Sequence, residues 1–285
     1  MSNNLESIAC PYCDSRNAST FSNIADIVKC SSCQLVYLRT RPTKEALYQI
    51  YQVYANDTSH MRPPNTVDEA KTHGLRREQL GDEIVSMVTQ KSGNWLDIGC
   101  GWGAFLLRAR ELGFTPVGIE MTRICLDFAS MQLQIPVSNS QFTDSSIPVN
   151  SCQVISMVHV LEHIPNPKET LTKIYDTLVP GGSFCGIVPN IASYCSEIEK
   201  DQWVWLDPTH HYVHYSPETL RQKLEEAGFV IDKIYTSVGD YNEFFDKIIR
   251  RQYPSLNDAE LYRKTIEIEQ SGKGEEIRFF VKKPF

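Results

Sequence analysis

An apolar run ends at Asp97 and passes directly into three alternating glycines, Gly99, Gly101 and Gly103, within the stretch WLDIGCGWGAFLL at 95–107. Glycine has no Cβ, so a turn built from it can approach a ligand closely, and a helix that follows offers unpaired N–H groups. The stretch therefore predicts a nucleotide-sized cleft at the carboxyl end of a strand. Its Gly-x-Gly-x-Gly spacing differs from the Gly-x-Gly-x-x-Gly of dinucleotide sites, which disfavours NAD as the ligand.

Further motifs follow in order along the chain. Glu120 ends the next short apolar run, and a carboxylate at this place can accept hydrogen bonds from both hydroxyls of a ribose. The later motifs are VISMVHVLEHIPNP at 154–167, LVPGG at 178–182 and VPN at 188–190. An ordered set of this kind is more specific than any single glycine motif.

The motif LDIGCGWG at 96–103 resembles the first motif of the class I S-adenosylmethionine-dependent methyltransferases, and the later motifs resemble that family in the same order. The resemblance implies S-adenosylmethionine as cofactor and an α/β fold with a doubly wound, mostly parallel, seven-stranded sheet. It implies a final strand inserted antiparallel beside its neighbour. The cofactor-binding residues implied are Asp97, Gly99, Cys100, Gly101, Gly103, Glu120, Met121, Gln141, Phe142, Met157 and His159. By the same resemblance Asp97 would position the cofactor amino group, and Gln141 or Phe142 would contact its adenine.

Charge and apolar patterning exclude some partners. The chain has 28 Lys and Arg against 35 Asp and Glu, a net charge of −7, and no long basic run, so a nucleic-acid partner is disfavoured. No Asn/Asp-Pro-Pro-Tyr signature of a nucleic-acid methyltransferase is present. The N-terminus lacks the pattern of a signal peptide and no run approaches 18 apolar residues, so we expect a cytoplasmic protein without a membrane span.

Two cysteine pairs lie near the N-terminus: Cys10 and Cys13, then Cys30 and Cys33. Two C-x2-C pairs at this separation are typical of a zinc ribbon, in which four thiolates bind one structural zinc ion. A disulfide within a pair is the less favoured alternative, because both pairs suit one shared metal. A four-sulfur site has no open coordination position, so we expect no catalytic role for it.

The sequence predicts three parts: a zinc ribbon at 1–40, a helical connector and possible lid at 41–92, and the methyltransferase domain at 93–285. In the connector we expect helices at 43–54 and 75–90, with a linker or mobile lid at 57–73. Helical spacing explains Tyr51 and Tyr54 as packing residues. The resemblance extends to ribbon-bearing methyltransferases that place this helix near the substrate entrance, so substrate contact by Tyr51 or Tyr54 is the alternative.

Short apolar runs alternate with helix-length segments through the third part. We expect strands at 93–98, 115–120, 136–138, 152–158, 183–188, 229–235 and 276–282, and helices at 103–112, 122–132, 167–178 and 217–227. Strands joined by helices require parallel pairing with right-handed crossovers, which gives a doubly wound sheet. Residues 240–274 are helix-rich, and the sequence assigns them no role.

A hydroxyl acceptor must lose a proton as it attacks a methyl group, and histidine suits that step near neutral pH. The candidate bases are His210, His163 and His211. His210 is favoured because Thr209-His210 resembles a Thr-His of the quinone O-methyltransferases. His159 stands where those relatives carry the first Glu of Glu-x-x-Glu-His, which favours cofactor contact over a divalent metal. The same loop carries Trp203, Trp205, Tyr212 and Tyr215, as either a substrate wall or a buried cap.

The resemblance predicts an enzyme that methylates a small-molecule or sugar-like acceptor at a hydroxyl oxygen, by in-line displacement in a cleft closed to water. One alternative is a nucleotide-sugar C-methyltransferase. Another is a methyltransferase-like binding module without catalysis, because fold does not decide function. The acceptor and the oligomeric state are not specified by the sequence.

Overall fold

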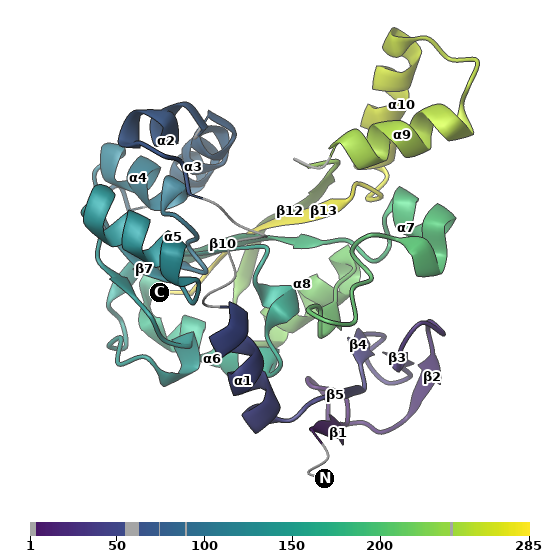
Figure 1. The fold of residues 1–285 in the computed structure, drawn as a ribbon, viewed down its shortest axis with the longest axis horizontal. Coiled ribbons are helices and arrows are strands. Elements are labelled where there is room, and N and C mark those ends of the chain that lie inside the picture. The colour runs from purple at the N-terminus through teal and green to yellow at the C-terminus, as the bar shows by residue number, and fades with distance from the viewer. Residues whose placement is uncertain (1–3, 55–62, 74, 89, 240–241) are drawn as a thin grey trace.

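The structure is a computed structural model that describes residues 4–54, 63–73, 75–88, 90–239 and 242–285. A twisted seven-stranded sheet runs through its centre with helices on both faces (Figure 1). Its strand order is β12-β13-β10-β9-β6-β7-β8. The strands are β6 (Gly93–Ile98), β7 (Phe114–Ile119), β8 (Val137–Ser138), β9 (Cys152–Val158), β10 (Leu178–Pro189), β12 (Val230–Ser237) and β13 (Glu276–Lys282). Strands β6 to β10 pair in parallel, which confirms the predicted doubly wound sheet.

The last strand, β13, lies between β10 and β12 and is antiparallel to both. This is the antiparallel insertion that the resemblance implies. Strand β10 starts earlier than predicted, because Leu178 already pairs with Cys152 and the register then shifts before Ser183. The Gly-Gly step at 181–182 is therefore an irregularity within a strand.

Helices cover the two faces of the sheet (Figure 1). Buried Ile84, Trp95 and Phe105 join α3 (Leu75–Met87) and α4 (Ala104–Glu111) to one face. On the other face, α6 (Pro167–Thr177) and α8 (Pro217–Glu226) contribute Leu171 and Leu220 to the large core cluster. The other α-helices up to Glu199 are α1 (Lys44–Tyr54), α2 (Val67–His73), α5 (Arg123–Asp127) and α7 (Tyr194–Glu199).

Two predicted segments differ from the structure. The linker expected at 57–73 is wrong for its second half, since α2 begins after Thr66, whose Oγ1 accepts a hydrogen bond from the Glu69 amide at 3.1 Å; residues 57–62 lie outside the described residues. The helix expected at 122–132 changes to a π-helical turn over Phe128–Gln132. There the Leu133 amide donates to the Phe128 carbonyl at 3.2 Å, five residues back.

The N-terminal residues form a small sheet of order β11-β4-β3-β2. Its strands are β2 (Ala18–Thr20), β3 (Ile27–Cys30), β4 (Val36–Leu38) and β11 (Val213–His214), and a separate pair joins β1 (Leu5–Ser7) to β5 (Thr40–Pro42). The fourth strand thus comes from far along the chain, after residue 210. The predicted boundary at residue 40 therefore does not separate two independent sheets.

A helical hairpin fills the segment whose role the sequence left open. It consists of α9 (Asn242–Gln252) and α10 (Asp258–Gln270), which connect β12 to β13 and project from the end of the sheet (Figure 1). Asn257 caps α10 in a reciprocal hydrogen-bond pair with Glu260. No helix in the described ranges has the length and apolar character needed to cross a bilayer.

We expect Gly186→Ala to destabilise the sheet strongly. A Cβ at this central position of β10 would lie 2.2 Å from the Met157 carbonyl oxygen and 2.7 Å from the Phe279 ring. Since the carbonyl belongs to a buried strand and has no room to move, the expected loss is about 2–4 kcal/mol of unfolding free energy, measured by urea denaturation. The control is Gly81→Ala in α3, a helical glycine without a positive φ whose added Cβ would meet first the flexible Arg108 side chain, at 2.8 Å. An equal loss in both variants would contradict this packing.

Candidate active site

The glycine turn lies at the carboxyl end of β6. Gly99, Gly101 and Gly103 have φ angles of 73°, 54° and 88°, which only glycine adopts without strain. A Cβ on Gly99 would approach Val160 to 2.4 Å. Gly103 caps α4 without a side-chain hydrogen bond, so the turn presents bare backbone beside free helix N–H groups, as a closely bound ligand requires.

Asp97 lies at the base of the turn and is buried. Its Oδ1 accepts a hydrogen bond from Ser156 Oγ at 2.6 Å, and Ser156 Oγ accepts one from Trp95 Nε1 at 2.9 Å. The carboxylate is thereby fixed between β6 and β9, and a carboxylate can accept several hydrogen bonds at once. This fits the predicted role of positioning a cofactor amino group.

Glu120 joins the glycine turn to the end of β7. Its Oε2 accepts from the Gly101 amide at 2.7 Å, and its Oε1 accepts from the Thr122 amide at 2.6 Å. Each carboxylate oxygen has a second lone pair. Glu120 can therefore accept the two hydroxyls of a ribose diol while keeping its backbone contacts, so the residues present fit an adenosyl cofactor.

The predicted adenine side is a 3-10 turn, Phe142–Asp144. Phe142 is buried, with the Lys173 Nζ 5.0 Å from its ring centre, and Lys173 also donates to the carbonyls of Thr143 at 2.9 Å and Ser145 at 2.7 Å. Burial lowers the pKa of Lys173. The turn is thus held against α6, with Gln141 partly exposed beside it. The adenine role of Gln141 and Phe142 stays a prediction.

Three other predicted cofactor residues differ in exposure. Cys100 and Met157 are buried in the core, so their side chains support the cleft from inside. Met121 is partly exposed beside Glu120. The side chains of Tyr51 and Tyr54 lie outside the described part of the chain, and their predicted substrate contact stays open.

His159 lies just beyond β9 with a left-handed φ of 53°. Its Nε2 donates to Glu276 Oε1 at 3.2 Å, and its Nδ1 forms an ion pair with Glu162 Oε1 at 3.5 Å. The ring stacks on Trp205 with the centres 5.5 Å apart. His159 therefore contacts β13 and the aromatic loop, and its cofactor contact stays a prediction.

The two acids keep His159 charged. Burial lowers the pKa of His159, but the contacts with Glu162 and Glu276 outweigh burial and raise it to about 10. Burial would raise the pKa of Glu162, but the His159 imidazolium holds it at about 2. Both carboxylate side chains are 2% exposed. No sequence motif indicates the contact between His159 and Glu276, because the two residues are more than a hundred positions apart in the chain.

His163 and His211 lie beside Glu162, with one ligand atom from each of the three within 4.8 Å of the others, so the set could hold a cation. His163 Nδ1 donates to the His210 carbonyl at 2.9 Å, and His211 Nδ1 donates to the Trp205 carbonyl at 2.8 Å. A carbonyl only accepts, so each Nδ1 carries a proton. Burial lowers the pKa of His211, which favours its neutral form.

His210 pairs with a carboxylate that reasoning from the sequence missed. Its Nδ1 donates to Asp207 Oδ2 at 2.5 Å, while Asp207 Oδ1 accepts from the Thr209 amide at 2.8 Å. The His210 side chain is 30% exposed, and Nε2 keeps the lone pair. Burial lowers the pKa of His210 below 6.5. The spacing of three residues in Asp-Pro-Thr-His could have indicated this pair.

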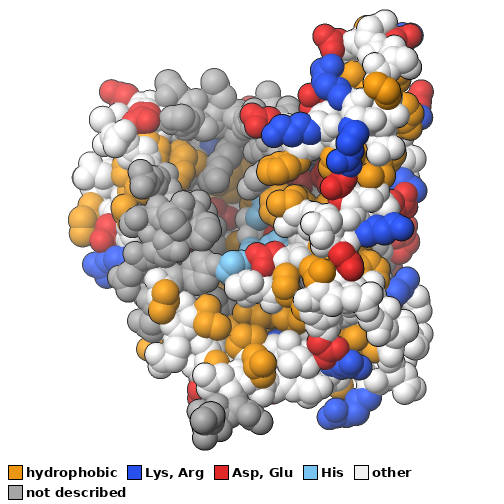
Figure 2. Space-filling view, turned by 45° about the vertical axis from the view of Figure 1, so that its right-hand side comes forward, with side chains coloured by type: hydrophobic (Ala, Val, Ile, Leu, Met, Phe, Trp, Pro, Cys, Tyr) orange, Lys and Arg blue, Asp and Glu red, His pale blue; other side chains and the backbone are white. Residues whose placement is uncertain are grey.

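The four aromatic residues of the loop at 203–215 are predicted from the sequence to form either a substrate wall or a buried cap, and they differ in burial. Trp203, Tyr212 and Tyr215 are buried, and Trp203 Nε1 donates to Glu275 Oε2 at 3.1 Å; these rings form the buried cap. Trp205 is partly exposed and lies between two imidazoles, 5.5 Å from His159 and 6.0 Å from His211. Figure 2 shows histidine side chains at the centre of this face, surrounded by apolar and acidic ones.

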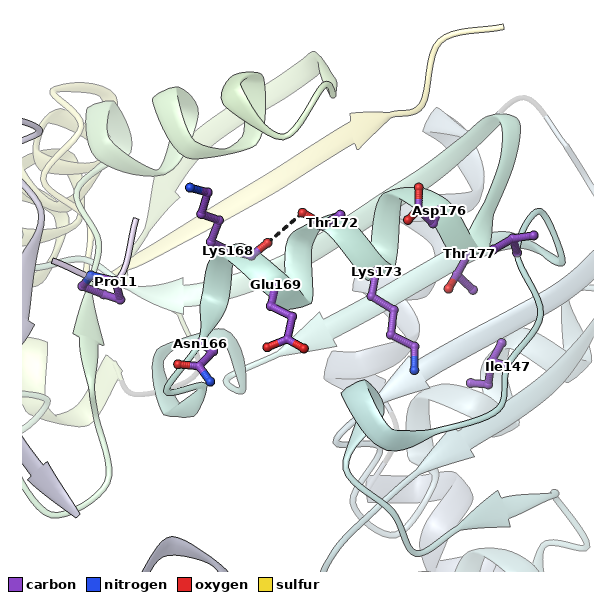
Figure 3. Close-up of a pocket in the computed structure, with 10 residues that line it drawn as sticks. Pro11, Ile147, Asn166, Lys168, Glu169, Thr172, Lys173, Asp176 and Thr177 are labelled. Atoms are coloured by element: carbon purple, nitrogen blue, oxygen red, sulfur yellow. Dashed lines mark hydrogen bonds between the residues drawn. The ribbon is translucent and has the colours of Figure 1, made fainter. Parts of the chain in front are cut away.

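A groove of about 640 Å³ runs along the outer side of α6 (Figure 3). Lys168, Glu169 and Thr172 line it from the helix, and Pro11 of the N-terminal sheet lies at one end. None of the predicted cofactor residues or histidines lines this groove. Lys173, one of its lining residues, also holds the predicted adenine turn.

The four N-terminal cysteines lie together. Their Sγ atoms are all within 4.8 Å of one another, with Cys10 to Cys33 and Cys13 to Cys30 both at 3.5 Å. Sulfurs bound to one zinc ion at about 2.3 Å in a tetrahedron are about 3.8 Å apart. The cluster therefore suggests the predicted structural zinc site, and the donor set fits that metal.

Comparisons with known proteins agree with this geometry. Residues 73–234 match the model of a family described as "Methyltransferase domain". A ubiquinone biosynthesis O-methyltransferase of Coxiella burnetii is 29% identical over 157 residues, which cover 51% of this chain and 67% of the relative. A geranyl diphosphate C-methyltransferase of Streptomyces coelicolor has a similar fold, with a TM-score of 0.55, 14% identity, and coverage of 85% of this chain and 100% of that one. The [4+2]-cyclase SpnF aligns with a TM-score of 0.53 and 18% identity over 73% and 81% of the two chains.

We expect the His159 imidazole to stay protonated at pH 8, because its pKa of about 10 lies above that pH. The measurement is a pH titration of the histidine ring resonances by NMR. Glu162→Gln removes one carboxylate and should move the His159 titration to lower pH, whereas Glu169→Gln, on the exposed side of α6, should not. A His159 resonance that titrates near pH 6.5 in the unmodified protein would contradict the buried ion pairs.

Proposed function

The chain belongs to the methyltransferase domain family, and on that premise we propose that it transfers a methyl group from S-adenosylmethionine to a hydroxyl oxygen of a small-molecule acceptor. It is a class I S-adenosylmethionine-dependent methyltransferase by family and fold. The choice of oxygen is supported by the relatives named as O-methyltransferases of ubiquinone biosynthesis. A phenolic or sugar-like hydroxyl is the proposed acceptor class.

The cofactor supplies an electrophilic methyl group on a sulfonium. We assign its binding to the glycine turn, Asp97 and Glu120, which lie at one edge of β6 and β7. There Glu120 would accept the ribose hydroxyls, and the turn would leave room for the amino-acid portion. These residues hold and orient the cofactor, and positioning supplies a large share of the rate in a displacement of this kind.

The observation that carries the proposal is the Asp207–His210 pair beside the end of β9. As the acceptor oxygen bonds to the methyl carbon and the carbon–sulfur bond breaks, the hydroxyl proton passes to His210 Nε2. Asp207 stabilises the imidazolium that forms and fixes the tautomer beforehand. The products are the methyl ether, S-adenosylhomocysteine and a proton that His210 releases to water.

Glu120→Ala should weaken the binding of S-adenosylhomocysteine by about 1–3 kcal/mol, the scale of hydrogen bonds to a charged group. The measurement is isothermal calorimetry, with thermal unfolding as a check on the fold. Glu120→Gln keeps one acceptor oxygen and should lie between the two affinities, and Glu169→Ala serves as the control. Unchanged affinity in Glu120→Ala would contradict the assigned cofactor site.

His210→Ala should lower kcat by about a hundredfold, the usual contribution of a general base, and Asp207→Asn should lower it less. The measurement is S-adenosylhomocysteine release with a panel of phenols, catechols and sugars as acceptors. Asp258→Asn, whose side chain is 87% exposed, is the control. Near-normal turnover in His210→Ala would contradict His210 as the base and favour His163 or His211 in that role.

The pH profile follows from the same pair. A base works only when it is unprotonated, so turnover should fall as the pH drops through the pKa of His210. Burial lowers that pKa, so the acid limb should have its midpoint below pH 6.5. A midpoint above pH 7 in kcat, for the acceptor with the highest turnover, would argue against His210.

A further inference from the structure

The four-cysteine ribbon, defined here as residues 5–42, is joined directly to the histidine segment, residues 203–215. Strand β11 completes the ribbon sheet by pairing antiparallel with β4, Val213 opposite Tyr37 and His214 opposite Val36. The Leu38 amide also donates to the Tyr212 carbonyl at 2.9 Å. Because His210 lies three residues before β11, the pairing of β11 with β4 fixes the position of His210, the proposed base.

A buried hydrogen bond strengthens this connection. Tyr12 lies between Cys10 and Cys13, and its hydroxyl is 3.0 Å from that of Tyr215. Both rings are buried. Tyr215 in turn bridges to Asn190 at the end of β10. One cysteine turn is therefore bonded to the residue that follows β11.

A buried cation lies at the same junction. The Lys223 side chain of α8 is 1% exposed, its Nζ lies 5.5 Å from the centre of the Tyr12 ring, and it pairs with Glu226 at 2.8 Å. Four thiolates around one Zn²⁺ carry a net charge of about −2. A lysine ammonium beside them reduces that charge, so the catalytic domain offers a partner for a metal-loaded ribbon.

Two more contacts anchor the ribbon on either side of the histidines. Arg41 donates to the Pro165 carbonyl and, at 3.2 Å, to Asn166 Oδ1, just after His163. Ser22 Oγ donates to Asp201 Oδ1 at 2.7 Å, just before the histidine segment. The ribbon thus contacts both chain segments that carry the candidate bases.

We propose that the ribbon is a metal-dependent brace for the histidine segment, and that Tyr12 and Tyr215 are positioning residues that hold His210 in place. The catalytic consequence rests on the proposed function. The apolar ribbon residues share one core cluster with Val213, Tyr215 and Leu220, and the metal would fix the cysteine turns, one of which carries Tyr12. Loss of the metal would displace the cysteine turns and β4. Strand β11 would then lose its backbone hydrogen bonds to β4, and the buried Tyr215 hydroxyl would lose its hydrogen bond to Tyr12. The cofactor site at 95–120 makes no use of these contacts.

The first experiment follows amide hydrogen exchange by mass spectrometry in the full chain, before and after removal of the metal with a chelator. Elemental analysis should find one zinc ion per chain at the start. We expect exchange in 205–215 to become at least tenfold faster in the metal-free protein, with exchange in 95–107 unchanged. Because this readout needs no methyl transfer, it stands even if no acceptor in the panel is methylated.

The second experiment keeps the metal and breaks the brace. Tyr12→Phe should lower kcat about tenfold with unchanged zinc content, unchanged KM for S-adenosylmethionine and unchanged affinity for S-adenosylhomocysteine. It should also speed exchange in 205–215. Tyr262→Phe on α10, where the side chain is 68% exposed, is the matched control and should change nothing.

Two outcomes would overturn the proposal. One is metal removal that leaves exchange in 205–215 unchanged, or that speeds 95–107 to the same extent, which would show no selective brace. The other is Tyr12→Phe with normal kcat and normal exchange in 205–215. Cofactor binding without methylation of any acceptor would instead count against the proposed function, and the exchange result would still decide the brace.

Discussion

The parallel register of β6 with its two neighbours is the constraint on which the site depends. Asp97 stands opposite Gly118 of β7 and opposite Ser156 of β9. Parallel strands end at the same edge, so the glycine turn, Glu120 and His159 emerge there together. A slip of one residue would turn Asp97 to the other face of the sheet and break its bond to Ser156. Burial of both faces fixes the register.

The second half of the site depends on buried charge. His159 lies with positive φ between two carboxylates that have almost no contact with water. Buried charges are costly unless they are paired, and here each acid has the same imidazolium as a partner. Since Glu276 lies at the start of β13 and Glu162 in the turn after β9, the charge pairing also fixes the distance between these two elements. The imidazole that stacks on Trp205 is thereby held from both sides by charged partners.

Much of the fold could be predicted, because local sequence determines it, and the structure brings the residues proposed for the cofactor to the ends of neighbouring strands. The glycine turn and Glu120 lie within one strand–helix–strand unit, where spacing along the chain translates directly into spacing in the sheet. The surroundings of the histidines could not be predicted to the same extent. His159 meets Glu276, and Tyr12 meets Tyr215, across more than a hundred residues. No periodicity in the sequence indicates such pairs, whereas Asp207 with His210 and Glu162 with His159 are pairs three residues apart that the sequence could have indicated.

This difference has a consequence for how such a site can vary. Substitutions in the glycine turn act on a backbone with positive φ and on bonds within one unit, so few residue types are compatible with it. The position of the histidine segment instead depends on the pairing of β11 with β4 of the ribbon, and that of His159 on its contact with β13. A shift in the packing between ribbon and α8 would move His210 and Trp205 relative to the fixed cofactor side without changing either residue. Substitutions between the ribbon and α8 would therefore act on the histidine segment from a distance, whereas substitutions in the glycine turn act directly on that turn.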